Sequence, residues 1–163
     1  MERIAKFLKV SIEQFLKDWI NCFPELESPY NNIKLPVRAT RGSAGYDFRT
    51  PVRIDLKPGE TIKIPTGIRV EIKDGWVLTL YPRSSLGFKY RLQLNNTVAI
   101  IDSDYFHAEN EGHIFLKLTN MGDKDVHVDA GEAIVQGVFV PFGITVDDAP
   151  TKMRTGGLGS TGK

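Results

Sequence analysis

The hydrophobic pattern of this chain changes its period at about residue 33, and that change constrains the fold more than any other feature. From there on, apolar and polar residues alternate in short stretches, at 52–56, 62–64, 68–72 and 114–118. A period of two is typical of strands with one buried face. Turn residues separate these stretches about every ten residues, at 58–59, 65–67, 74–75, 121–123 and 130–131. The sequence therefore predicts a mainly β sandwich or barrel over residues 33–150, without the βαβ alternation of a doubly wound fold.

The segment before this domain has the helical period instead. At 11–23 apolar residues recur every three or four positions, which predicts an amphipathic helix. Ser11 and Gln14 can form a capping box at its start, and Pro24 ends it. We expect this helix to pack on the core rather than on a partner or a membrane surface, because its polar face carries both signs of charge. Residues 1–32 are thus predicted to be a helical extension and connector, and residues 151–163 a mobile, glycine-rich lid.

Composition excludes several classes of protein. The chain has 163 residues, 41% of them hydrophobic, which is enough for the core of one domain. Its 21 Lys plus Arg nearly balance 20 Asp plus Glu, and a net charge of +1 argues against binding nucleic acid or membranes through bulk charge. Cys22 is the single cysteine, so an intrachain disulfide is excluded and a reducing cytoplasm is expected. No signal peptide and no apolar run of ~20 residues is recognisable.

Two segments have residues suited to binding phosphate. Segment 42–48 combines small residues with Asp47, and segment 82–87 places Arg83 beside Ser84 and Ser85. A guanidinium, two hydroxyls and consecutive backbone amides can all donate to phosphate oxygens. The alternatives are a tight turn for the first segment and a helix cap for the second.

Three further segments carry polar groups in unusual places. Asp102 and Asp104 follow an apolar run that is predicted to be a buried strand, and a strand end can hold a desolvated general base. Their spacing points both carboxylates to the same side if the chain is extended. Gln136 interrupts an apolar strand, and the tail at 154–162 joins Arg154 to hydroxyls and unshielded amides. A solvated acidic turn, an amide bonded to neighbouring backbone and an inert linker are the alternatives.

The histidines form no convincing metal set. His107 and His113 are six residues apart, with Glu109 and Glu111 between them, and they lack the spacing of a helical chelate. We expect a solvated loop at this position.

Taken in this order, the five segments resemble the five sequence motifs of the homotrimeric dUTPases, over the chain from about Leu35 to Lys163. The resemblance implies a β-jelly roll, a homotrimer whose sites are shared between chains, and hydrolysis of dUTP to dUMP and pyrophosphate. Such an activity limits uracil incorporation into DNA and supplies dUMP for dTMP synthesis. It also implies Mg²⁺ carried by the substrate phosphates, with no direct protein ligand.

The resemblance also implies roles for individual residues. Asp102 is the general base that activates water for attack on the α-phosphorus, and Asp104 and Asp47 are supporting acids. Asn96 reads uracil, and Tyr105 packs on the sugar and leaves no room for a 2′-hydroxyl. The other implied substrate contacts are backbone groups beside uracil, phosphate-binding side chains and the closing tail: Val98, Ile100, Ile101, Arg83, Ser84, Ser85, Gln136, Arg154, Gly157, Leu158, Gly159, Ser160 and Thr161.

The chain departs from the family pattern at a few points. Ala99 stands where the family has glycine, Ala133 where it has arginine and Leu158 where it has phenylalanine, while 106–110 looks like an insertion. These changes predict a weaker or differently built lid contact rather than loss of hydrolysis.

Two rival functions follow from the same fold. A dCTP deaminase shares the R-S-S-L string but needs a catalytic glutamate where this chain has Lys117. A non-catalytic nucleotide-binding jelly roll would have no need to keep Asp102 and Arg83 together.

Overall fold

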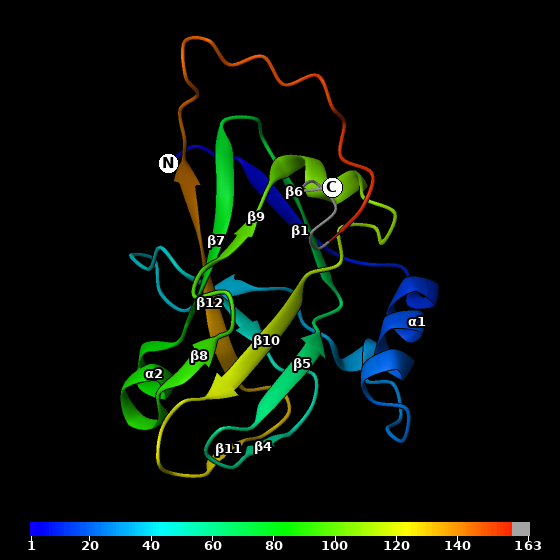
Figure 1. Cartoon of the computed structure of the whole chain (residues 1–163), viewed down its shortest axis with the longest axis vertical. Coiled ribbons are helices and arrows are strands. Elements are labelled where there is room, and N and C mark those ends of the chain that lie inside the picture. Colours follow the sequence, from blue (N-terminus) through cyan, green and yellow to red (C-terminus); the bar gives the residue numbers. More distant parts are fainter. Residues whose placement is uncertain (158–163) are drawn as a thin grey trace.

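The computed structural model describes residues 1–157 and is built mainly from short antiparallel strands (Figure 1). Each stretch of alternating hydrophobicity coincides with a strand or overlaps one, and the predicted mainly β fold is confirmed. The helical elements are α1 (Ile12–Cys22), η1 (Tyr30–Asn32), α2 (Ser84–Tyr90) and η2 (Ser103–His107). The strands are β1 (Ala5–Lys9), β2 (Val37–Arg38), β3 (Tyr46–Arg49), β4 (Ile54–Leu56), β5 (Thr61–Pro65), β6 (Ile68–Ile72), β7 (Trp76–Pro82), β8 (Leu92–Leu94), β9 (Ala99–Ile101), β10 (Phe115–Asn120), β11 (Val126–Val128) and β12 (Ala133–Pro141).

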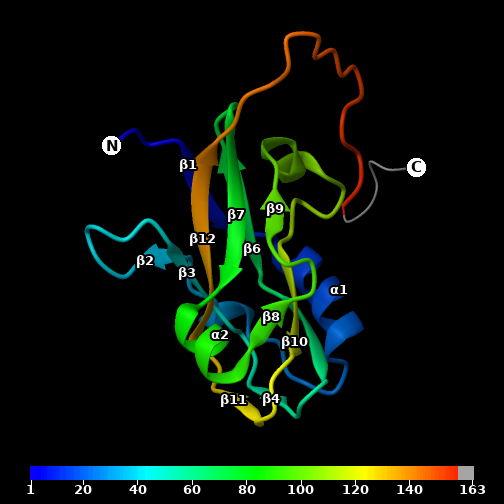
Figure 2. The same ribbon diagram turned by 60° about the vertical axis from the view of Figure 1, so that its left-hand side comes forward.

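The largest sheet has the strand order β2-β3-β12-β7-β9, with every neighbouring pair antiparallel. β12 lies in the middle, where Gln136 pairs with Asp47 of β3 and with Tyr81 of β7. Figure 2 shows β12 and β7 running side by side. Three smaller ladders complete the strands of the described chain, in the orders β5-β10-β8, β1-β6 and β11-β4. The topology thus makes β9 an edge strand of the main sheet.

The core lies between this sheet and the smaller ladders. Leu78 and Leu80 of β7 and Ile134 of β12 are fully buried in one cluster with Ile64 of β5 and Leu118 of β10. Burying such apolar side chains is the main favourable term in folding. In β10 the buried Leu116 and Leu118 flank the exposed Lys117, and this alternation is the reason that the period of two predicted the strand. In β7 and β12 consecutive residues are buried instead.

The N-terminal extension is part of this core. α1 begins after Ser11, whose side chain accepts a hydrogen bond from the backbone N–H of Gln14, as the predicted capping box requires. Phe15 and Trp19 of α1 are buried, and their rings stack with centroids 5.5 Å apart. β1 precedes the helix and pairs with β6. The periodicity did not predict β1. The expectation that the helix packs on the core is confirmed.

Cys22 is half-buried at the end of α1, where burial raises the pKa of its thiol and favours the unreactive protonated form.

After β12, residues 142–153 are exposed, and the chain leaves the sheet and returns to η2 (orange to red in Figure 1). No helix within residues 1–157 is long and apolar enough to cross a membrane.

Candidate active site

Asp102 stands at the end of β9, as the sequence predicted. In β9 burial alternates, because Ala99 and Ile101 are buried and Ile100 between them is exposed. Asp102 follows as the next residue of the chain. The next residues do not stay extended, because Asp102 is the N-cap of the 3-10 helix η2. The prediction of two acids on one side of an extended chain is therefore wrong in its geometry. Asp104 lies instead in the first turn of η2.

A single guanidinium nevertheless joins these two acids. Arg154 Nη2 donates to Asp102 Oδ2 at 2.8 Å, and Arg154 Nε donates to Asp104 Oδ1 at 2.9 Å. The arginine side chain is only 16% exposed, whereas the two carboxylates are about half exposed. Charge-assisted bonds of this kind are among the stronger hydrogen bonds in proteins. The tail and the predicted base, 52 residues apart in the sequence, thus form one ionic cluster.

Tyr105 lies beneath this cluster. The residue is 7% exposed, and the Arg154 guanidinium carbon lies 5.7 Å from the ring centroid. The hydroxyl donates to the backbone carbonyl of His113 at 2.6 Å and accepts from Asn110 Nδ2 at 2.9 Å. Burial raises the pKa of Tyr105, so the phenol stays protonated and keeps donating to that carbonyl.

The insertion at 106–110 contacts the tail. The backbone N–H of Glu109 donates to the carbonyl of Thr155 at 3.1 Å. A Cβ built on Gly157 would lie 3.3 Å from Asn110 Nδ2 and 3.8 Å from Tyr105 Cε2, so the tail passes close over both. The sequence did not predict this contact. The predicted contacts Leu158, Gly159, Ser160 and Thr161 lie outside the described residues.

A second group of predicted residues gathers around α2. Arg83 is the N-cap residue of α2, and its Nε lies 3.7 Å from Asp47 Oδ1. Asp47 in turn pairs with Gln136 across β3 and β12. Ser84 and Ser85 are exposed in the first turn of the helix. Three segments that are distant in the sequence therefore meet on one side of the main sheet.

An open groove of about 490 Å³ adjoins this second group. Arg83 and Ser84 line it together with Phe88 and Arg91, two residues that the sequence did not single out. Arg91 has a positive φ of 53° and ends α2, a backbone position that no motif indicated. Two guanidiniums around an open groove suit an anionic group.

The two groups are far apart within one chain. Ile101, next to Asp102, pairs with Leu78 at one end of β7, whereas Arg83 follows the other end of that strand. Five residues of strand span ~16 Å. Figure 1 shows the same separation between α2 and the end of β9. Within one chain, Arg83 and Asp102 therefore cannot contact the same phosphate.

The predicted uracil contacts lie on β9 and in the turn that precedes it. Asn96 is exposed in the turn between β8 and β9, and the backbone N–H of Val98 donates to its carbonyl at 2.7 Å. Ile100 is 57% exposed on β9. Because β9 is an edge strand, the backbone of this segment has one side that pairs with no strand of the described chain.

His113 is a correction to the expectation of a solvated loop. Its side chain is fully buried, with Asp18 of α1 on one ring nitrogen and the backbone N–H of Gly67 on the other. The reason is that residues 111–113 turn inward to start β10 beneath α1. His107 is exposed, as expected.

Comparison with known proteins places this geometry in a family. The family model described as dUTPase matches residues 31–162. The deoxyuridine 5'-triphosphate nucleotidohydrolase of Lactococcus lactis is 43% identical over 143 residues, covering 85% of this chain and 95% of that protein. The corresponding protein of Mannheimia succiniciproducens is 40% identical over 141 residues, covering 82% of this chain and 90% of that protein.

Solved structures agree with these relatives. The dUTPase of Streptococcus mutans has a TM-score of 0.64 and 36% identity, covering 87% of this chain and 98% of that one. A dUTPase of Staphylococcus bacteriophage 80alpha, solved with dUpNHpp, shares the fold at a TM-score of 0.65 and 18% identity, covering 94% and 100%. With a family model that matches most of its length and relatives at this identity, the chain belongs to the dUTPase family.

Proposed function

We propose that this chain hydrolyses dUTP to dUMP and pyrophosphate, with Asp102 as the general base. The observation that carries the proposal is the position of Asp102, half exposed at the end of β9 and bonded to Arg154 of the tail. Its relatives named deoxyuridine 5'-triphosphate nucleotidohydrolase support the same activity.

The reaction requires a base, a water and an in-line leaving group. Asp102 accepts a proton from a water whose oxygen attacks the α-phosphorus, and the bond from that phosphorus to the bridging oxygen breaks. Pyrophosphate leaves with the bond electrons. Arg154 already contacts Asp102, so an arriving triphosphate competes for its guanidinium and draws the tail over the site. The carboxylate is then free to accept the proton.

Recognition of uracil and deoxyribose falls to β9 and η2. Ile100 and Ile101 lie on the edge strand β9 and Val98 directly precedes it, which supports a role of their backbone groups in reading the base, together with Asn96. Tyr105 is held by its hydroxyl beneath Arg154, and this position supports a role in packing on the sugar and excluding a ribose 2′-hydroxyl.

Phosphate binding is proposed for Arg83, Ser84, Ser85 and Gln136. Their distance from Asp102 within one chain supports a site assembled between chains, and we propose a homotrimer. Asp47, 3.7 Å from Arg83, would orient that guanidinium, and Asp104 would orient Arg154. The lone Cys22, which cannot form an intrachain disulfide, supports action in a reducing cytoplasm.

Magnesium fits this site as part of the substrate. The dUTPase of phage phi11 of S. aureus coordinates a structural Mg(II) ion. Among residues 1–157, no three His, Cys, Asp or Glu side chains gather as a metal site. We therefore expect magnesium to be bound by triphosphate oxygens and water, where it neutralises phosphate charge. The protein's own residues orient the phosphates and the water.

The rival reaction is deamination of dCTP. Its catalytic glutamate would stand at Lys117, which is exposed on β10 opposite Lys63 and cannot act as that acid. Incubation with dUTP, dCTP and UTP in magnesium, with pyrophosphate and ammonia both measured, separates the functions. Pyrophosphate from dUTP alone is expected. Ammonia from dCTP would indicate a deaminase. If neither product forms, the chain would be a nucleotide-binding protein without catalytic activity.

A further inference from the structure

The N-terminal helix contacts the same short segment that holds Tyr105. α1 lies outside residues 31–162, the part of the chain that the family model matches. We propose that α1 positions Tyr105 for recognition of deoxyribose, with Asp18 and His113 as positioning residues. This inference rests on the proposed role of Tyr105 in packing on the sugar.

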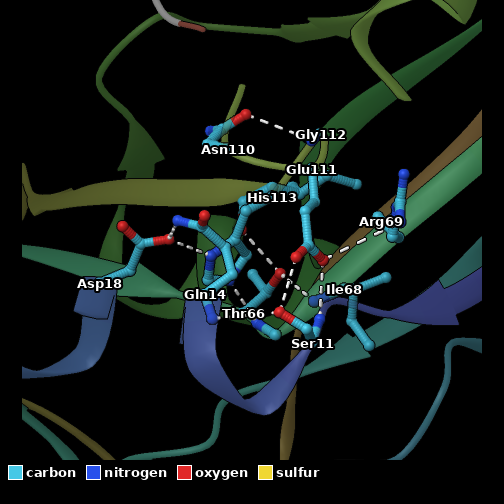
Figure 3. Close-up of polar contacts among 12 residues, drawn as sticks. Ser11, Gln14, Asp18, Thr66, Ile68, Arg69, Asn110, Glu111, Gly112 and His113 are labelled. Carbon is cyan, nitrogen blue, oxygen red and sulfur yellow. Dashed lines mark hydrogen bonds and ion pairs between the residues drawn. The ribbon is translucent and has the colours of Figure 1, made fainter. Parts of the chain in front are cut away.

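The side chain of His113 links α1 to the core. Its Nε2 accepts a hydrogen bond from the backbone N–H of Gly67 at 2.8 Å, so this nitrogen carries no proton. Nδ1 therefore carries the hydrogen of the neutral ring and donates to Asp18 Oδ2 at 2.6 Å (Figure 3). Asp18 Oδ2 also accepts from Gln14 Nε2 at 2.8 Å within α1. Burial lowers the pKa of His113, which favours this neutral form against the raising effect of Asp18 and Glu111.

The main chain of the same residue holds Tyr105. The carbonyl oxygen of His113 accepts from the Tyr105 hydroxyl at 2.6 Å. Because the His113 ring is fixed on both nitrogens, its backbone is fixed as well. Two hydrogen bonds thus connect the carboxylate of Asp18, through His113, to the hydroxyl of Tyr105.

A second contact fastens the other end of α1 to this segment. Glu111 Oε2 accepts from the backbone N–H of Ser11 at 2.7 Å, and Oε1 accepts from its hydroxyl at 2.6 Å (Figure 3). Burial raises the pKa of Glu111, but the two bonds from Ser11 together with nearby positive charge, including Arg69, lower the pKa overall. The carboxylate therefore stays charged, with Arg69 Nη1 3.9 Å away. Ser11 caps α1 and Asp18 lies two turns later, so the helix binds the segment at two points.

Gly112, between these two anchored residues, is pressed against η2. It has a φ of +70°, and a Cβ built on it would lie 2.6 Å from the carbonyl oxygen of Tyr105 and 2.8 Å from Phe106 Cα. Arg69 contacts η2 from β6, with its guanidinium 3.7 Å from the Phe106 ring centroid and Nη2 donating to the Phe106 carbonyl at 2.6 Å. Movement of 111–113 would therefore move Tyr105.

The test is the ratio of kcat/KM for dUTP to kcat/KM for UTP. The amount of folded enzyme cancels in this ratio, so a merely structural role of α1 leaves it unchanged. We expect Asp18→Ala to lower the ratio roughly 3- to 30-fold, the range for residues that act through a packed network. Asp18→Asn, whose amide oxygen can still accept from His113, should keep most of the dUTP-to-UTP ratio. Glu13→Ala, an exposed acid of α1 outside these contacts, leaves it unchanged.

A double-mutant cycle tests the route. Tyr105→Phe removes the hydroxyl that bonds to His113, so Asp18→Ala has no further effect on the ratio in that background. An equal effect in both backgrounds, or an unchanged ratio in Asp18→Ala, would overturn the positioning role. If Asp18→Ala fails to fold, Ser11→Ala removes the second anchor and is measured in the same way.

Tyr105→Ala separates this inference from the function on which it rests. A lower ratio in Tyr105→Ala with no change in Asp18→Ala contradicts the positioning role alone. An unchanged ratio in Tyr105→Ala contradicts the role of Tyr105 in sugar recognition, and the positioning role with it.

Discussion

Arg154 of the tail and Asp102 at the end of β9 form an ion pair at 2.8 Å. Arg154 also bonds Asp104, so its guanidinium is shared between two carboxylates. The guanidinium therefore offsets the charge of the proposed general base, and in the proposed mechanism a triphosphate competes for it. We expect binding of the triphosphate and release of the base to be coupled.

Replacement of Arg154 tests this coupling. Arg154→Ala is expected to lower kcat/KM for dUTP about 10- to 100-fold, since a hydrogen bond to a charged group contributes ~1.5–3 kcal/mol. Arg154→Lys keeps the charge but cannot bridge two carboxylates, so an intermediate loss is expected. The exposed Lys152→Ala is the matched control for a tail cation. Equal losses in Lys152→Ala and Arg154→Ala would mean that only the net charge of the tail matters.

The two acids are expected to differ in effect. Asp102→Asn cannot accept the proton from water and should lose roughly three or more orders of magnitude in turnover while still binding dUTP. Asp104 is 56% exposed in η2, and Arg154 is its one ionic partner among residues 1–157, so Asp104→Asn should lose less than about tenfold. Pyrophosphate release gives the rates, and calorimetry gives the affinity of dUTP for the inactive variant. A near-normal rate in Asp102→Asn would contradict its role as base.

Gly112 should be far less tolerant of a side chain than another glycine with positive φ. Gly112→Ala meets both the backbone strain of φ +70° and the backbone of Tyr105 and Phe106, whereas Gly131→Ala, at φ +89°, has nothing within 4 Å. Strain alone costs about 1–2 kcal/mol, and the clash should add roughly 1–3 kcal/mol for Gly112→Ala. Urea unfolding at one protein concentration measures both. Equal losses would show that 111–113 can move away from η2 freely.

The buried His113 predicts how stability depends on pH. Its pKa is lowered in the folded state from 6.5, mainly by burial, so between the two pKa values the unfolded chain binds the extra proton. The free energy of unfolding therefore rises with pH: the contribution of His113 is complete above about pH 6.5 and is lost as the pH falls below it. The slope is at most ~1.4 kcal/mol per pH unit for one proton.

Unfolding midpoints at pH 5.5 and 7.5 measure this slope, with the exposed His107→Gln as control. The control should keep the slope of the unchanged chain. A stability that is independent of pH over this range, or a slope that disappears in His107→Gln, would contradict the account of His113.

Local patterns predicted the elements whose burial alternates or follows a helical face. The stretch 68–72 is β6, and Ser11 caps α1 where the capping signal stands. β1 was missed because its five residues grade from exposed to half-buried without alternation, and its partner β6 is far along the chain. Such a strand forms because of its pairing with a distant strand, not because of a local sequence pattern.

The sequence indicated candidate residues for the site but not how they are arranged. Asp102 at a strand end follows from the apolar run before it, but the turn into η2 changes where Asp104 points. His113 was misjudged because its partners Asp18 and Gly67 are 95 and 46 residues away, and no local pattern reports them. Likewise, the separation of Arg83 from Asp102 follows only from the register of β7 and β9.

Hydrolysis of dUTP in ¹⁸O-labelled water tests the central claim most directly. If the water activated by Asp102 attacks the α-phosphorus, one ¹⁸O atom appears in dUMP and none in pyrophosphate when the products are weighed by mass spectrometry. Label in pyrophosphate instead would place the attack on the β-phosphorus and contradict the account.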